Sequence, residues 1–256
     1  MNDINWIGLY TFVRREIERI MRVKVQTIAA PLISATLFIF IFGFVLGSRI
    51  DFIAGVPYMQ FVFPGILTMT VLMSAFEHTS STVYFGRWVR SIHEILVSPF
   101  SYVEMVVGYV WSAVLRAILL SFGILAVGLV FGAVSITHPL LFVVSVAGVA
   151  TLFALVGILV GLWANGFEQL GVLNTFLITP LTMLGGMFYS IEFLPQAVKT
   201  ITLVNPFFYI INTMRFATTG ITEAPLWIGL VLMAALIISL GFLVVHLFRK
   251  GWRIRE

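Results

Sequence analysis

The chain has 256 residues, of which 60% are hydrophobic and only 10% are charged. Soluble domains carry about 25% charged residues, so the composition excludes an ordinary soluble protein and indicates one integral membrane domain. The net charge of +4 could suggest nucleic acid binding, but basic residues also gather at the cytoplasmic ends of membrane spans. Because there is no cysteine, disulfides and thiolate metal sites are excluded.

The first predicted element is an amphipathic helix over residues 5–22, within a cytoplasmic segment that covers residues 1–24. Its apolar face follows the i, i+3, i+4, i+7 spacing of a helix and consists of Trp6, Leu9, Tyr10, Val13, Ile17, Ile20 and Met21. The opposite face is polar and consists of Arg14, Arg15, Glu18, Arg19 and Arg22. Such a helix lies in the headgroup plane of the membrane. It is either a plain anchor or also a contact surface for a partner.

Six apolar stretches are long enough to cross about 30 Å of hydrocarbon, which takes about 20 helical residues. They cover residues 25–46, 60–85, 102–131, 139–163, 170–188 and 226–248. Most of the 15 Lys and Arg residues lie before the first stretch, after the second or after the sixth. This distribution predicts that both termini are cytoplasmic. We therefore expect an all-α membrane protein with six transmembrane helices, in which the loop at 164–169 is the weak point because it lacks a basic residue.

A short amphipathic segment over residues 86–99 connects the second and third stretches. Its apolar face holds Ile92, Ile95 and Leu96, and its polar face holds Arg87, Arg90, Ser91 and Glu94. Pro99 ends the predicted helix, because proline disfavours helix at the residue before it. On the cytoplasmic side such a helix can act as a lever between a soluble partner and two spans. From the residues alone, an ordinary charged loop is an equal alternative.

Ionisable residues within the predicted spans form a second candidate site. Arg116 lies inside the third stretch, and Glu77 and His78 lie in the cytoplasmic half of the second. A central arginine costs about 2.5–3.5 kcal/mol on insertion scales, so Arg116 should face protein or water. Glu77 is its nearest candidate partner by sequence. The alternative is that Arg116 snorkels or caps a neighbouring helix.

The segment 187–224 is strongly apolar but is interrupted by Pro195, Asn205-Pro206 and Gly220. Each apolar piece is too short to cross a membrane, so we expect re-entrant or interfacial helices. We also expect an aromatic belt at the outer interface, which could line the translocation pathway. Its members would be Phe188, Tyr189, Phe193, Phe207, Phe208, Tyr209 and Trp227.

Several motifs taken together resemble those of ABC-2-type permeases, the membrane subunits of one class of ATP-binding-cassette exporters. Residues 94–99, Glu-Ile-Leu-Val-Ser-Pro, look like the family signature in which a Glu and a Leu precede a Pro. Further matches are residues 179–190, Leu194-Pro195, residues 205–209 with Arg215, and residues 58–65. The resemblance covers essentially the whole chain. It is greatest to small bacterial permeases similar to those that export lipooligosaccharides, polysaccharides and hydrophobic drugs.

The resemblance implies one transmembrane domain over residues 1–256, with a coupling helix at 86–99 and re-entrant helices between spans 5 and 6. It also implies two permease subunits, as a homodimer or with a similar permease, bound to two ATPase subunits at the bacterial cytoplasmic membrane. The residues that would couple to the ATPase are Arg87, Arg90, Glu94, Ile95, Leu96 and Pro99. The chain has no G-x-x-x-x-G-K-[ST] loop. ATP and Mg²⁺ would therefore be bound by the partner, and the chain itself needs no cofactor or metal.

The best interpretation is a subunit of an exporter that moves an amphipathic substrate: a lipid, a lipid-linked glycan or a hydrophobic drug. The main alternative is a secondary transporter or channel that needs no ATPase. It would require an ionisable site near the midplane, for which Glu77 and Arg116 are the only candidates. An intramembrane hydrolase that uses Ser80 or His78 is a third possibility, but the chain lacks a Gly-x-Ser-x-Gly elbow.

Overall fold

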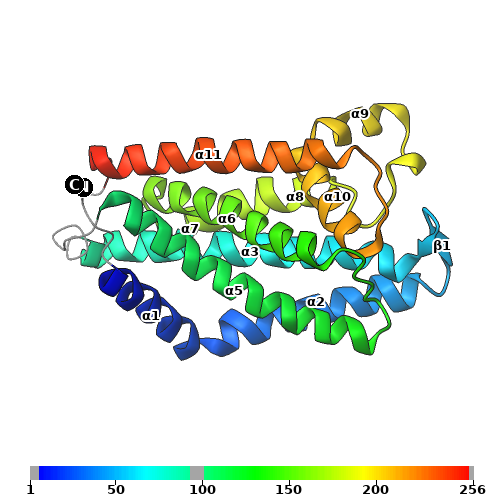
Figure 1. Ribbon diagram of the computed structural model, residues 1–256, viewed down its shortest axis with the longest axis horizontal. Coiled ribbons are helices and arrows are strands. Elements are labelled where there is room, and N and C mark those ends of the chain that lie inside the picture. Colours follow the sequence, from blue (N-terminus) through cyan, green and yellow to red (C-terminus); the bar gives the residue numbers. More distant parts are fainter. Residues whose placement is uncertain (1–5, 93–100, 254–256) are drawn as a thin grey trace.

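The structure, a computed structural model, describes residues 6–92 and 101–253. Within these residues the regular structure is helical, apart from an antiparallel pair of two-residue strands, β1 (Phe52–Ile53) and β2 (Val56–Pro57). The predicted all-α class is therefore confirmed. The start of α1 and the end of α11 lie at one end of the bundle, and β1, α9 and α10 lie at the other (Figure 1).

The N-terminal part consists of α1 (Trp6–Arg22) and, after an elbow, the first long apolar helix (Figure 1). That second helix runs over Val25–Leu46, the same bounds as the predicted first span. It is assigned as η1 (Val25–Ala29), α2 (Ala30–Phe38) and η2 (Ile39–Leu46), because two of its stretches have π-helical hydrogen bonds.

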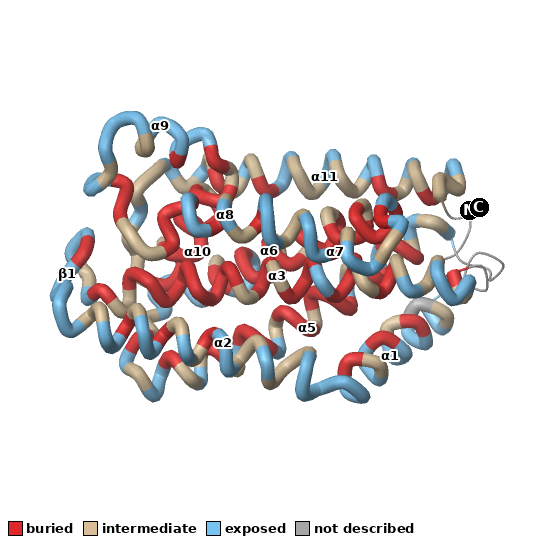
Figure 2. The backbone as a smooth tube through the Cα atoms, turned by 180° about the vertical axis from the view of Figure 1, so that it is seen from behind, coloured by how far each residue is buried: buried red, intermediate tan, exposed pale blue. Residues whose placement is uncertain are grey.

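Four further helices are long and apolar enough to cross a membrane: α3 (Tyr58–Trp88), α5 (Tyr102–Val130), α6 (Pro139–Trp163) and α11 (Leu226–Lys250). In the most apolar window of α3, 78% of the residues are buried, against 17% for Val25–Leu46 and for α11. Helix α3 is therefore the centre of the bundle, and α2 and α11 lie on its outside. Figure 2 shows the buried residues concentrated along α3, α6 and α10.

Small residues let α3 and α6 approach closely. A Cβ atom at Gly157 would lie 2.5 Å from the carbonyl oxygen of Phe76, and one at Gly161 would lie 2.7 Å from that of Ser80. The hydroxyl of Thr79 also donates a hydrogen bond to the carbonyl oxygen of Ala154 at 2.9 Å. Close backbone approach at small residues, with a hydroxyl bridging two helices, is the usual means of helix packing in membranes. It makes α3 and α6 the most extensively packed pair.

The predicted fifth span at 170–188 is shorter in the structure. It corresponds to one helical run of α7 (Phe167–Leu173), η3 (Asn174–Ile178) and α8 (Thr179–Met183). At 1.5 Å per residue this run is about 25 Å long. It ends before Gly186, whose φ of 74° lies in the left-handed region that other residues rarely adopt. Among the described residues, five helices rather than six have the length and composition of a span. The predicted span at 170–188 is not among them, so six spans stay a prediction.

The segment 187–224 folds into short helices, and its breaks fall where the sequence predicts them. After η4 (Ile191–Phe193), Pro195 precedes α9 (Gln196–Val204), and Asn205 caps α10 (Pro206–Thr219) by accepting a hydrogen bond from the Phe207 amide at 3.0 Å. Gly220, with a φ of 76°, ends α10. Helix α10 packs against α3, α6 and α11, which makes it part of the core.

Candidate functional site

The structure brings the three predicted intramembrane polar residues together around one cavity of about 600 Å³. We call it the polar cavity and define it by five of its lining residues: Arg19, Glu77, His78, Arg116 and Asn174. These residues come from α1, α3, α5 and η3. Glu77, His78 and Arg116 were predicted as an intramembrane site from the sequence, whereas Arg19 was predicted only on the polar face of the N-terminal helix and Asn174 was not predicted.

Arg116 is buried in the wall of the polar cavity and has no hydrogen-bond or close ion-pair partner among the described residues, although the charge of Glu77 acts on it. Only 5% of its surface is exposed, and its Nε atom has no hydrogen-bond acceptor. Among the described residues, no carboxylate oxygen lies within 4.0 Å of its guanidinium. The hypothesised Arg116–Glu77 ion pair is therefore not formed, although both side chains line the same cavity. Glu77 instead accepts a hydrogen bond from Nδ2 of Asn174 at 3.2 Å.

A chain of polar contacts connects α1 to α5 along the polar cavity. Arg19 forms an ion pair with the buried Glu16 at 3.0 Å, and its Nη2 atom lies 3.4 Å from Nδ1 of His78. The other ring nitrogen of His78, Nε2, lies 2.9 Å from the hydroxyl oxygen of Ser112. Arg19 also donates a hydrogen bond to Thr82. The N-terminal helix is thus held to the bundle through charged groups that point inward.

The side of α1 that packs against the bundle shares only Ile20 with the predicted apolar face. Phe12, Glu16 and Ile20 are buried, whereas the predicted apolar residues Trp6 and Tyr10 are exposed. Phe12 fits against Gly108 and meets the ring of Tyr109 edge-on, with 4.9 Å between centroids. The exposed apolar side agrees with a helix in the headgroup plane. The signal for the buried side was the narrow i, i+4, i+8 stripe of these three residues.

A second cavity of about 260 Å³ adjoins the polar cavity and shares Gln26 and Glu77 with it. We call it the groove. It runs between α2 and α3, and its further lining includes Ser34, Ala35, Phe38, Met69, Met73 and Ser74. Because α2 and α3 run in opposite directions along it, the groove leads from the polar cavity toward the end of the bundle that carries β1 and α9.

Aromatic rings close the far end of the groove. Phe38 borders the groove, and Phe42, one helical turn further on, stacks on Phe188 with 4.0 Å between ring centroids. The rings of Phe38 and Phe188 are 6.4 Å apart. Phe188, predicted as a member of the aromatic belt, thus lies where the groove meets the segment after α8.

The remaining belt residues divide into buried and exposed groups. Phe207 and Phe208 are buried inside the bundle, and Phe207 packs 5.4 Å from the ring of Phe153. These two residues are core residues of this chain, so the prediction that they belong to a surface belt is wrong. Tyr189 and Tyr209 are partly exposed, and Phe193 and Trp227 are exposed.

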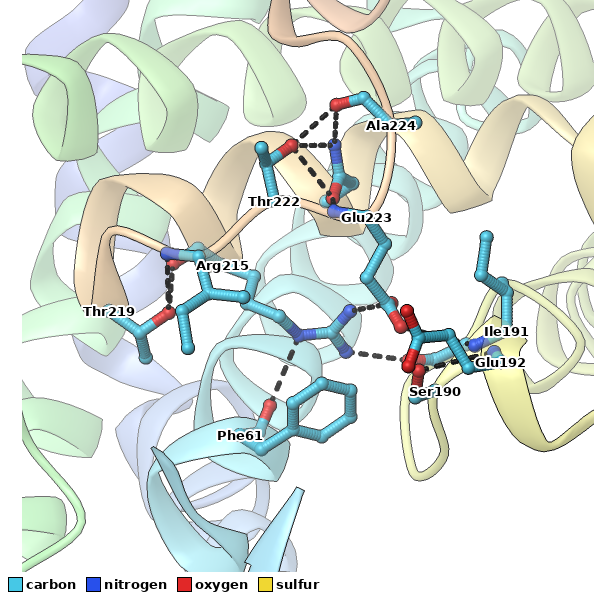
Figure 3. Close-up of polar contacts among 12 residues, drawn as sticks. Phe61, Ser190, Ile191, Glu192, Arg215, Thr219, Thr222, Glu223 and Ala224 are labelled. Atoms are coloured by element: carbon cyan, nitrogen blue, oxygen red, sulfur yellow. Dashed lines mark hydrogen bonds and ion pairs between the residues drawn. The ribbon is translucent and has the colours of Figure 1, made fainter. Parts of the chain in front are cut away.

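At the end with α9 and α10, Arg215 forms a network that is fully satisfied within the chain (Figure 3). Its Nη1 atom pairs with Glu223 at 2.8 Å, Nη2 donates to the carbonyl oxygen of Gly186 at 2.6 Å, and Nε donates to that of Phe61 at 3.3 Å. Glu223 also accepts a hydrogen bond from the amide of Ile191 at 3.1 Å. Burial lowers the pKa of Arg215 to about 10, and Glu223 opposes that change. Arg215 is therefore charged at neutral pH, and it joins α10, α3, the turn after α8 and the loop between α10 and α11.

At the opposite end, Arg87 and Arg253 cap α6. Arg87 donates hydrogen bonds to the carbonyl oxygens of Gly161, Ala164 and Arg253 at 2.9, 3.0 and 2.7 Å. Arg253 donates to the carbonyl oxygen of Trp163 and the side chain of Asn165. Cations are favourable where carbonyl groups at a helix C-terminus lack partners. The loop that lacks basic residues thus receives two arginines from elsewhere in the chain.

Of the six predicted coupling residues, the structure describes only Arg87 and Arg90. Arg87 uses its guanidinium within the chain, whereas Arg90 is exposed and has a φ of 58°. Glu94, Ile95, Leu96 and Pro99 lie outside the described residues. Their contact with an ATPase stays a prediction.

A bundle of long apolar helices around a polar cavity defines a multi-pass membrane protein of the transport type. Residues 8–218 match the sequence model of the ABC-2 type transporter family, and the chain belongs to this family. It is 32% identical to the inner membrane transport permease YadH of Escherichia coli (strain K12). The alignment of 256 residues covers 100% of both chains. The family resemblance deduced from the motifs is thereby confirmed.

More distant relatives carry the name Nodulation protein J. The protein of Rhizobium leguminosarum bv. viciae is 26% identical over 226 residues, which is 85% of this chain and 83% of that protein. The protein of Rhizobium meliloti (strain 1021) is 28% identical over 218 residues, which is 84% of this chain and 81% of that protein.

Proposed function

We propose that this chain is the permease subunit of an ATP-driven exporter that moves an amphipathic substrate across the bacterial cytoplasmic membrane. It works as a homodimer with two copies of a separate ATPase, which binds ATP and Mg²⁺, and both its termini are cytoplasmic. Membership of the ABC-2 family supports an ABC ATPase as partner. The polar cavity beside a largely apolar groove supports a substrate with a polar and an apolar part, such as a lipid, a lipid-linked glycan or a hydrophobic drug.

The observation that carries this proposal is the capping of α6 by Arg87. The guanidinium joins the end of α3, where the proposed coupling segment 86–99 begins, to the end of α6 and to the C-terminal tail. Because α3 and α6 are also closely packed, a push on the coupling segment moves both helices together. When the ATPase subunits close, their motion would thereby move α3, the helix that lines both the polar cavity and the groove.

The test is a charge reversal in the coupling segment, Glu94→Lys, in the permease co-purified with its ATPase. We expect loss of substrate-stimulated ATP hydrolysis while membrane insertion is unchanged. The matched control is Glu192→Lys, an exposed charge reversal at the other end of the bundle, which should leave stimulation at the wild-type level. Unchanged stimulation in Glu94→Lys would refute the proposed coupling.

The polar cavity also favours a second candidate function, secondary transport without an ATPase. Glu77 and Arg116 in the wall of a cavity are the kind of ionisable site that ion-coupled transport requires. Transport measured with a catalytically inactive ATPase partner separates the two functions. Full activity that collapses with an ionophore would establish the secondary transporter, and loss of activity would exclude it.

A further inference from the structure

The starting point is Arg116, a buried cation that has no hydrogen-bond or close ion-pair partner among the described residues. Burying a charge that has no direct partner is costly, and the attraction of Glu77 across the cavity offsets only part of that cost. Arg19 is paired with Glu16 and bonded to Thr82, and Glu77 accepts a hydrogen bond from Asn174. The guanidinium of Arg116 lines the polar cavity and has no acceptor among the described residues, so it can bind an anionic group that enters the cavity.

The cavity wall also holds an acceptor without a donor. The side-chain oxygen Oδ1 of Asn174 is buried and has no hydrogen-bond partner, because the amide nitrogen is used on Glu77. A ligand that completes the site must bring acceptor oxygens to Arg116 and donors to Asn174 and Glu77. A phosphate ester that carries hydroxyl groups does both, because guanidinium binds phosphate in a bidentate manner and hydroxyls donate to amide and carboxylate oxygens.

The surroundings of the cavity suit an attached hydrocarbon chain. Its rim includes the exposed apolar side chains of Val23 and Phe167. The groove begins at Gln26 and Glu77, where the polar cavity ends, and continues along α2 and α3 past Met69 and Met73. A headgroup in the polar cavity would thus have a largely apolar channel directly beside it.

We propose that the polar cavity binds the phosphate of an anionic lipid with a hydroxyl-bearing headgroup, of the glycerol-phosphate or sugar-phosphate class. The acyl chain of that lipid lies in the groove. Arg116 holds the phosphate, and Asn174 and Glu77 accept hydrogen bonds from the hydroxyls. This assignment rests on the proposed function, since it names the substrate class of the exporter, but the binding step itself needs no ATPase.

The test measures lipid binding to the purified full-length permease by native mass spectrometry and by thermal unfolding in detergent. The probes are dioleoylphosphatidylglycerol, dioleoylphosphatidylcholine, which lacks hydroxyls and net charge, and inorganic phosphate. We expect the wild type to bind the phosphatidylglycerol in preference to both other probes. Arg116→Gln should weaken that binding about 10- to 100-fold, as expected for the loss of hydrogen bonds to a charged group. Arg49→Gln, an exposed arginine at the other end of the bundle, should bind as the wild type does.

A second pair of variants tests the groove. Ser34→Phe fills the groove, and Ile33→Phe places the same ring on the exposed side of the same helix. We expect only Ser34→Phe to weaken binding of dioleoylphosphatidylglycerol, with little effect on a short-chain analogue.

Three outcomes would overturn the proposal: equal wild-type affinity for both lipids, undiminished binding in Arg116→Gln, or stabilisation by inorganic phosphate equal to that by the lipid. ATPase co-purification and stimulated hydrolysis are measured on the same preparations. If these persist while lipid selectivity is absent, the headgroup assignment fails and the exporter function stands. Arg116→Gln removes a buried charge that has no hydrogen-bond partner among the described residues, so the Tm of the lipid-free variant should stay near that of the wild type. Measured beside binding, this Tm separates lost binding from misfolding.

Discussion

Removing one partner of the Arg215–Glu223 pair should strongly destabilise the permease. The guanidinium is completely buried, and Glu223 is its only carboxylate partner among the described residues, at 2.8 Å. The variant Glu223→Ala leaves that charge uncompensated. Breaking a buried pair in this way costs about 3–5 kcal/mol, whereas replacing both partners by apolar residues is often neutral. Arg215→Met/Glu223→Leu should therefore recover most of the stability that either single variant loses.

The size of the loss follows from the contacts of Arg215. Besides Glu223 it bonds the carbonyl oxygens of Gly186 and Phe61, and its guanidinium carbon lies 3.8 Å from the centroid of the Phe61 ring. These groups join α10 to α3 and to the turn after α8, so the loss should be felt across the outer end of the bundle. For a chain of this size, 3–5 kcal/mol corresponds to a fall in Tm of roughly 6–20 °C.

The assay is thermal unfolding of the wild type, both single variants and the double variant in one detergent. Glu192→Gln, an exposed neighbour of the same loop region, is the control and should change stability by less than about 0.5 kcal/mol. A double variant as unstable as the sum of the two single variants would refute the reasoning, because additivity means that the two side chains do not interact.

Two further predictions concern the centre and the opposite end of the bundle. Gly157→Val should lower the free energy of unfolding by about 1–3 kcal/mol or more through overpacking, since an added Cβ would collide with Oγ1 of Thr79. The control is Gly171→Ala, which adds a methyl group in open space and should not lower Tm. Arg87→Gln should lower stimulated ATP hydrolysis while ATPase co-purification persists, and the exposed Lys250→Gln should lower neither. Wild-type stimulation in Arg87→Gln would show that the cap on α6 does not transmit force.

The parts of the fold that the sequence predicts are those governed by local chemistry. The first span has the predicted bounds because apolar length alone determines it. The breaks around α9 and α10 fall at Pro195, Asn205 and Gly220 because each residue imposes its own backbone conformation. The error at the end of the fifth span has the same kind of cause. The prediction followed the apolar stretch through Gly186, whereas the helical run ends at Met183, just before the positive φ of Gly186.

The partners of the charged residues could not be predicted in this way. The periodicity of residues 5–22 selects the broad apolar face of α1, and it hides the narrower stripe with Glu16 that faces the bundle. Glu77 was the nearest acid to Arg116 by sequence, yet its hydrogen-bond donor is Asn174, far along the chain. The caps on α6 come from α3 and from the tail. Each case depends on how distant helices pack, which a single sequence does not encode in any local pattern.

Three arginines at different depths of the bundle explain how such packing relates to function. Arg87 and Arg215 are each satisfied by groups of the same chain, one at either end. Arg116, between them, is more buried than Arg87 and nearly as buried as Arg215, but it has no hydrogen-bond or close ion-pair partner among the described residues. Burial removes hydration from all three guanidinium groups, which is costly. Hydrogen bonds within the chain offset this cost for Arg87 and Arg215, whereas Arg116 has only the electrostatic attraction of Glu77 among the described residues. A satisfied charge fixes helices in place, whereas an unsatisfied one is completed only by what enters the cavity. The two ends therefore provide the rigid frame, and the proposed lipid site lies in the middle, at Arg116.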